Sequence, residues 1–148
     1  MSFFKIINIL FLSLTPSHML QIPVKTNNKT ELVDITSHVQ ESVSESNIKE
    51  GIVVIQSTHT TAGITINENA DPDVKTDILK ALEIFNRDDY KHSEGNSDAH
   101  VKTSLMGSSA TVIIKDNKLQ LGIWQSIFLA EFDGPRNRKI LIELIPKI

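Results

Sequence analysis

Residues 52–72 read IVVIQSTHTTAGITINENADP, and this stretch decides the fold. The first part, residues 52–58, is rich in β-branched residues and predicts a buried strand. Residues 61–67 predict a second strand of the same kind, so His59 and Thr60 fall at the bend between the two. The sequence therefore places an imidazole and a hydroxyl group at the bend between two strands.

The same stretch ends by opening a helix. Asp71 can accept hydrogen bonds from the free N–H groups of a first helical turn, and Pro72 suits the first helical position. Beyond them, apolar residues recur at intervals of three and four residues and give one apolar face: Val74, Ile78, Leu82 and Phe85. We expect capping to account for Asp71.

Outward from this stretch, strand patterns dominate the chain. Strands are expected at 20–26, 31–35, 109–115, 118–124, 126–132 and 139–145, and helices from Thr36 or Ser37 to Gly51 and from Ser97 to Met106. Asp116-Asn117 is a two-residue hairpin signal. The alternation of Leu119, Leu121 and Ile123 predicts a half-buried strand, and Trp124 is expected in the core. About eight strands with clustered helices predict a single α+β domain of antiparallel sheet over residues 20–148.

The composition excludes or disfavours several classes of function. The chain has 148 residues, with 15 Lys and Arg against 18 Asp and Glu, a net charge of −3. This acidity disfavours nucleic acid as a partner, because phosphate neutralisation requires a basic face. The chain contains no cysteine, which excludes disulfides, thiolate zinc sites and cysteine nucleophiles.

Residues 1–19 form a separate segment. Residues 3–14, FFKIINILFLSL, are apolar but shorter than the roughly 20 residues that a membrane span needs. Three interpretations stay open: a dispensable tail from a misplaced start, an export signal, or a structural first strand. We expect a cytoplasmic protein, unless residues 1–18 act as a signal peptide.

Three of the five histidines lie in the middle of the chain: His59, His92 and His100. Neutral imidazole is a common zinc ligand, and three histidines with an open fourth position are typical of catalytic sites. Asp98 and Glu94 are candidates to orient the rings. The spacing also suits histidines that are simply solvated near loops, so both interpretations remain.

Two further polar groups are candidates for a site. Glu68 and Asn69 lie between a strand and a helix, where they could hold Mg²⁺ or bind a ligand hydroxyl. Asp133 and Arg136 lie in a turn; arginine binds phosphate in a bidentate manner, although the spacing alone favours a solvated surface hairpin.

Four blocks together resemble the YjbQ family, whose members are often labelled secondary thiamine-phosphate synthase. The blocks are ELVDIT (31–36), HTTAGITINENAD (59–71), YKHSEGNSDAH (90–100) and KLQLGIWQSIFLAEFDGPRNR (118–138). The resemblance runs from about Leu20 to the C terminus. Gly63 departs from the alanine of many members, and Ile123 departs from their threonine.

This resemblance implies a β-sandwich-like α+β domain that forms a homotrimer. It implies one polar site in which His59, His92 and His100 are catalytic or metal-binding residues, with Glu68 and Arg136 as further catalytic residues. Asn69 and Asp133 would bind the cofactor, a divalent ion such as zinc or magnesium.

The implied reaction joins hydroxymethylpyrimidine diphosphate to a thiazole phosphate and releases pyrophosphate, and the family's activity in it is regarded as weak or secondary. A small phosphorylated molecule is therefore the expected partner. Two alternatives stay open: a hydrolase that depends on a histidine-bound metal, and a non-enzymatic trimer that binds a small ligand or a metal.

Overall fold

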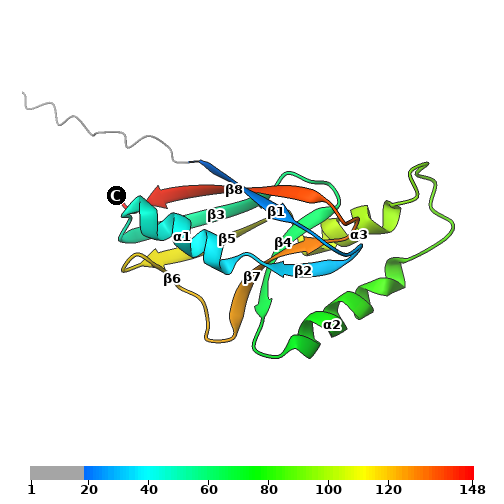
Figure 1. Cartoon of the computed structure of the whole chain (residues 1–148), viewed down its shortest axis with the longest axis horizontal. Helices are drawn as coiled ribbons and strands as arrows, with labels where there is room; N and C mark the ends of the chain where they lie inside the picture. Colours follow the sequence, from blue (N-terminus) through cyan, green and yellow to red (C-terminus); the bar gives the residue numbers. More distant parts are fainter. Residues whose placement is uncertain (1–18) are drawn as a thin grey trace, which may run out of the picture.

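The computed structural model describes residues 19–148 (Figure 1). The predicted tail lies almost wholly outside these residues. The strands are β1 (Leu20–Lys25), β2 (Glu31–Asp34), β3 (Glu50–Ser57), β4 (Ala62–Glu68), β5 (Ser109–Lys115), β6 (Lys118–Leu119), β7 (Gln125–Glu131) and β8 (Asn137–Pro146). The helices are α1 (Thr36–Ser46), α2 (Pro72–Ala81) and α3 (Ser97–Met106), with a short 3₁₀ helix η1 (Leu82–Phe85).

The strands form two antiparallel sheets. One has the order β1-β8-β3-β5-β6, and the other has the order β2-β7-β4. Apolar side chains of both sheets meet in one core, including Val53 and Ile55 of β3, Ile64 of β4 and Leu129 of β7. The predicted α+β fold with a sandwich-like core is therefore confirmed.

A second apolar cluster covers the other face of the three-stranded sheet. Phe128 and Phe132, both fully buried, pack there with Ala99 of α3 and Ile78 of α2. Together with η1, these two helices occupy the end of the molecule away from the C terminus (Figure 1). Among residues 19–148, no helix is both long and apolar enough to span a bilayer.

The bend at His59 and Thr60 connects the two sheets. β3 pairs with β5 and β8 in the five-stranded sheet, whereas β4 pairs with β7 in the three-stranded sheet. The chain therefore changes layers at this bend. His59 consequently lies at the edge between the layers rather than in either core.

The helix signals were mostly correct. The Asp71 side chain accepts a hydrogen bond from the Asp73 amide, and Pro72 begins α2, as predicted. The helix ends at Ala81, so the apolar face continues as η1 through Phe85. α1 ends earlier than predicted, because Asn47 takes the left-handed conformation (φ 58°) that terminates helices.

Gly51 lies inside the sheet rather than at the end of α1. A Cβ there would approach the Ile145 carbonyl oxygen to 2.2 Å. Glycine is required because β8 pairs closely with β3 at this point.

The predicted strand 118–124 is wrong beyond Leu119. Asp116 and Asn117 form the expected hairpin turn with positive φ angles of 53° and 60°. The chain then leaves the sheet, because the Gln125 amide donates to the Gly122 carbonyl and closes a second turn. Ile123 and Trp124 are consequently 95% and 61% exposed, so the tryptophan does not pack in the core.

Candidate functional site

The bend after β3 and one face of α3 border a groove of about 640 Å³. Two of the predicted histidines, His59 and His100, line it together. The other lining residues are mostly small and hydroxyl-bearing: Ser57, Thr58, Thr60, Thr103, Ser104, Gly107 and Ser108. Ser57 and Ser104 already donate to the Ala62 and His100 carbonyls, so the other hydroxyls supply the hydrogen-bond donors. The lining has no fixed negative charge, which suits an anionic or hydroxylated ligand.

A glycine in β4, Gly63, lies against Gly107, one of the residues that line this groove. A Cβ on Gly63 would lie 2.6 Å from the Gly107 carbonyl oxygen, which accepts a hydrogen bond from the Ile64 amide. The glycine therefore lets the end of α3 sit against β4. This contact is a structural reason for glycine at this position.

The ring of His59 is fixed by the backbone of β8. Its Nε2 accepts a hydrogen bond from the Lys139 amide at 3.1 Å, so the neutral ring carries its proton on Nδ1. Burial lowers the pKa of His59, and the nearby positive charge of Arg138 lowers it further. The imidazole is therefore neutral near pH 7 and can donate a hydrogen bond through Nδ1.

His92, the third predicted histidine, is in contact with His100. The rings of His92 and His100 meet edge to face with centroids 5.5 Å apart. These two residues line a second, shallow depression with Tyr90, Ser97 and Val101. His100 thus lies between two adjacent hollows, with His59 on one side and His92 on the other.

The donor groups of one chain do not match a metal site. Within residues 19–148 no three His, Asp or Glu side chains are grouped so that they could hold a metal ion. Nε2 of His59 is already hydrogen-bonded to the Lys139 amide. Asp98, a candidate to orient a histidine, instead bonds Lys102 at 3.0 Å, while Glu94 lies 3.8 Å from His92. A divalent ion therefore does not fit this chain alone.

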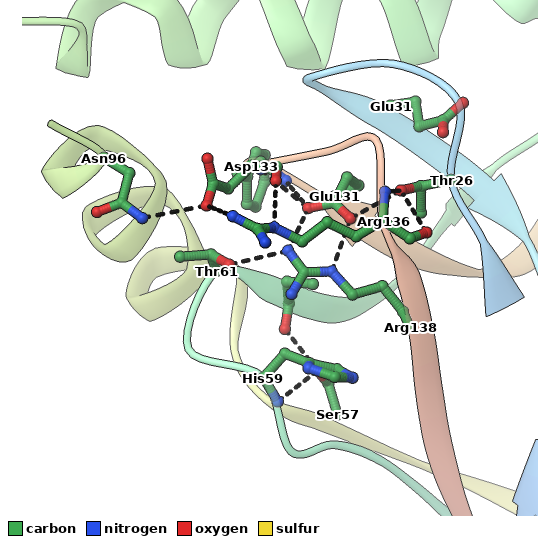
Figure 2. A network of polar contacts seen from close by, with 12 residues as sticks. Thr26, Glu31, Ser57, His59, Thr61, Asn96, Glu131, Asp133, Arg136 and Arg138 are labelled. Atoms are coloured by element: carbon green, nitrogen blue, oxygen red, sulfur yellow. Dashed lines mark hydrogen bonds and ion pairs between the residues drawn. The ribbon is translucent and has the colours of Figure 1, made fainter. Parts of the chain in front are cut away.

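Asp133 and Arg136, two of the predicted site residues, lie beside this region and pair with each other (Figure 2). Arg136 donates to the Asp133 carboxylate at 2.7 Å, and Asn96 donates to the same oxygen at 3.1 Å. Burial raises the pKa of Asp133, but the bonds from Asn96 and Arg136 outweigh burial and leave the pKa below its usual value. Arg136 is half exposed, so this turn presents a cation to solvent.

Sequence reasoning missed a buried ion pair between Glu131 of β7 and Arg138 of β8. Arg138 donates to the two Glu131 oxygens at 2.7 and 2.6 Å, and both residues are buried. Arg138 also donates to Thr61 at 2.8 Å, next to the histidine bend. Figure 2 shows this pair between the Asp133–Arg136 turn and His59. No pattern in a single strand reveals a pair formed between strands.

Glu68 and Asn69 lie elsewhere. They lie at the opposite end of β4 from the histidine bend. The strand has seven residues, so this end is roughly 20 Å of extended chain from Ala62. Asn69 donates to Asp34 at 2.8 Å through its side chain and to the Trp124 carbonyl at 2.8 Å through its amide. One chain therefore brings His59, His92, His100, Asp133 and Arg136 to one end and leaves Glu68 and Asn69 at the other.

Known proteins match nearly all of the described chain. Residues 20–147 match the family described as UPF0047 protein YjbQ-like. UPF0047 protein MJ1081 of Methanocaldococcus jannaschii is 57% identical over 124 residues, which are 82% of this chain and 90% of that protein. UPF0047 protein YugU of Bacillus subtilis is 45% identical over 127 residues, which are 84% of this chain and 96% of that protein.

Solved structures show a similarity to the same family. A yjbq/upf0047 family protein of Clostridium acetobutylicum superposes with a TM-score of 0.83 at 53% identity, covering 85% of this chain and 99% of that chain. A YbjQ-like protein of Sulfolobus solfataricus, described as being of unknown function, has a TM-score of 0.82 at 34% identity, covering 88% and 98%. The chain therefore belongs to the YjbQ/UPF0047 family.

Proposed function

We propose that this protein is a transferase for small phosphorylated molecules that joins hydroxymethylpyrimidine diphosphate to a thiazole phosphate, as a homotrimer and with weak or secondary activity. The carrying observation is the groove that His59 and His100 share with six Ser and Thr residues. Hydroxyl and neutral imidazole N–H donors suit phosphate oxygens. The reaction itself comes from the family resemblance.

The proposed chemistry needs little beyond positioning and charge stabilisation. The thiazole nitrogen attacks the methylene carbon of the pyrimidine, a C–N bond forms, and the C–O bond to the diphosphate breaks. The electron pair of that bond leaves with pyrophosphate. Donors that meet the developing charge therefore provide the catalysis.

Three side chains have distinct roles in this proposal. His59 donates from Nδ1 to a phosphate oxygen, because the Lys139 amide holds its Nε2. His100 contacts the same group from α3, and Arg136 supplies a cation from its half-exposed position. A divalent ion, which the family resemblance implies, is assigned no step here.

The test is direct. Purified protein is incubated with the two precursors, and thiamine phosphate is measured by mass spectrometry. We expect product, a large loss in His100→Ala, and wild-type activity in the matched control His38→Ala, whose ring is exposed on α1. Arg136→Ala should likewise lose activity, whereas Arg87→Ala, which removes an exposed arginine, should not.

Three results would overturn the assignment. Absence of product with the wild-type protein contradicts the transferase. Release of phosphate that chelators abolish and that ignores Arg136→Ala indicates the metal-dependent hydrolase. Ligand or metal binding without turnover of any phosphate ester indicates a non-enzymatic binding protein.

A further inference from the structure

The end of the molecule away from the histidines carries an unusual apolar projection. Ile123 is 95% exposed and Trp124 is 61% exposed, although both lie in an ordered turn. The Trp124 carbonyl accepts the Asn69 amide at 2.8 Å, and Gly122 and Gln125 close the turn on either side. Tryptophan on a rigid support is typical of interface hot spots, because little entropy is lost when it docks.

Acidic and amide groups surround this projection. Asn69 donates to Asp34 at 2.8 Å, and Glu68 is paired in register with Gln125, the residue after the tryptophan. We call Asp34, Glu68, Asn69, Ile123 and Trp124 the acidic corner. It combines apolar anchors with two carboxylates, so it suits a partner surface that is hollow and positively charged or rich in donors.

The histidine groove of the same chain has these complementary properties. It is an open hollow, and none of its lining residues is a carboxylate. Besides burial, the charges of Arg138 and Lys139 both lower the pKa of the nearby His59, whereas the charge of Glu131, the buried partner of Arg138, raises it. The hydroxyl of Thr103, which lines the groove, is buried without a hydrogen-bond partner among the described residues. The lining of the groove therefore offers donors and contributes no carboxylate, and the Glu131 carboxylate near His59 is held by Arg138.

One chain cannot bring these two surfaces together. They lie at opposite ends of β4, a strand fixed along its length by seven register pairs with β7. A second copy can do so, because the two surfaces are different patches of the same molecule. Contacts of this head-to-tail kind close into a ring when the rotation between copies permits.

We infer that the acidic corner of one subunit docks over the histidine groove of a second copy, which completes a composite site between subunits. Glu68 of one copy then lies at the rim of the next copy's groove, beside His59 and His100, and supplies a carboxylate that the lining of the groove lacks. This inference rests on the homotrimer of the proposed function, but its tests do not require that reaction.

Paired cysteines test the contact, since the chain contains no natural cysteine. Glu68→Cys combined with Ser104→Cys places one thiol in the corner and one at the groove. The two positions lie too far apart in one chain for a disulfide, so oxidation or a short bis-maleimide should yield covalent dimers and trimers. Ser44→Cys combined with Ser104→Cys is the control, because Ser44 is exposed on α1.

Tryptophan fluorescence provides a second test that leaves the proposed contact intact. Trp124 is the only tryptophan in the sequence, so the emission reports on this residue alone. Its fluorescence should be blue-shifted in the oligomer and should shift to the red on dilution. Ile123→Asp should give monomers with red-shifted emission, whereas Ile84→Asp, at another exposed isoleucine on η1, should stay assembled. Circular dichroism verifies that each variant is folded.

The inference is overturned if the Glu68/Ser104 pair cross-links no better than the control pair. It is equally overturned by a monomeric wild-type protein, or by an oligomer in which Trp124 emits as a fully solvated ring. Cross-linking in a protein that forms no thiamine phosphate would instead refute the proposed reaction and leave the composite site standing.

Discussion

Replacing Arg138 with methionine should destabilise the protein strongly. The Glu131 carboxylate is fully buried and accepts five hydrogen bonds: two from Arg138, which form the ion pair, one from Thr26, and one each from the amides of Phe132 and Asp133. The substitution removes the only cation among these donors. The carboxylate is then left in the interior with three neutral donors.

Breaking a buried pair from one side typically costs about 3–5 kcal/mol, because the remaining charge is uncompensated. We expect a loss near the lower end of that range, since the Thr26 hydroxyl and two amides still bond the carboxylate. Removing both charges in Glu131→Leu/Arg138→Met should recover much of the loss.

The loss of stability in Arg138→Met should also depend on pH. In the native protein burial raises the pKa of Glu131, but Arg138 and the Asp133 amide outweigh burial and hold it below its usual value. A depressed folded-state pKa stabilises the protein above the unfolded-state value, and this contribution disappears as pH falls through the folded-state pKa. Without Arg138, burial dominates and the carboxyl takes up a proton more readily. The difference between wild type and variant should therefore shrink as pH is lowered from neutrality.

Urea denaturation followed by circular dichroism at several pH values measures these effects, with unchanged m-values as evidence of a two-state comparison. Arg87→Met is the control, because the Arg87–Asp89 pair is exposed and should contribute nothing measurable. The reasoning is refuted if Arg138→Met is as stable as this control, or if the double variant is less stable than the single one.

Two further predictions concern other buried groups. Lys102 is 3% exposed and bonds Asp98 at 3.0 Å and Asn86 at 2.6 Å. Lys102→Met should therefore lower the free energy of unfolding by about 3 kcal/mol in a urea titration, because it leaves Asp98 unpaired. A loss no larger than that of the exposed Lys147→Met would contradict this prediction. His59 should titrate below the ordinary value of about 6.5 in an NMR experiment, because burial and then Arg138 lower its pKa. Since a depressed imidazole pKa means that the unfolded chain takes up a proton first, stability should fall as pH drops below 6.5, and His59→Gln should lack that component.

The sequence determined much of the fold because its signals were local. Asp71 and Pro72 specify the start of α2 through capping chemistry, and Asp116-Asn117 specifies a hairpin through positive φ angles. The strands around residues 52–58 and 61–67 also followed from local composition. Local signals failed at Trp124, where apolar alternation predicted a strand but hydrogen bonds between Gly122 and Gln125 closed a turn.

The candidate site depended on contacts between distant segments. The sequence alone identified His59, His92, His100 and Arg136 as chemically suitable, because imidazole and guanidinium groups are recognisable by type. Only the tertiary structure decided that His59 and His100 share a groove, that the Lys139 amide occupies Nε2 of His59, and that Glu68 lies at the other end of β4. The physical reason is that pairing between strands, such as that of Glu131 with Arg138, is set by sheet register and layer packing, which no short window of sequence encodes.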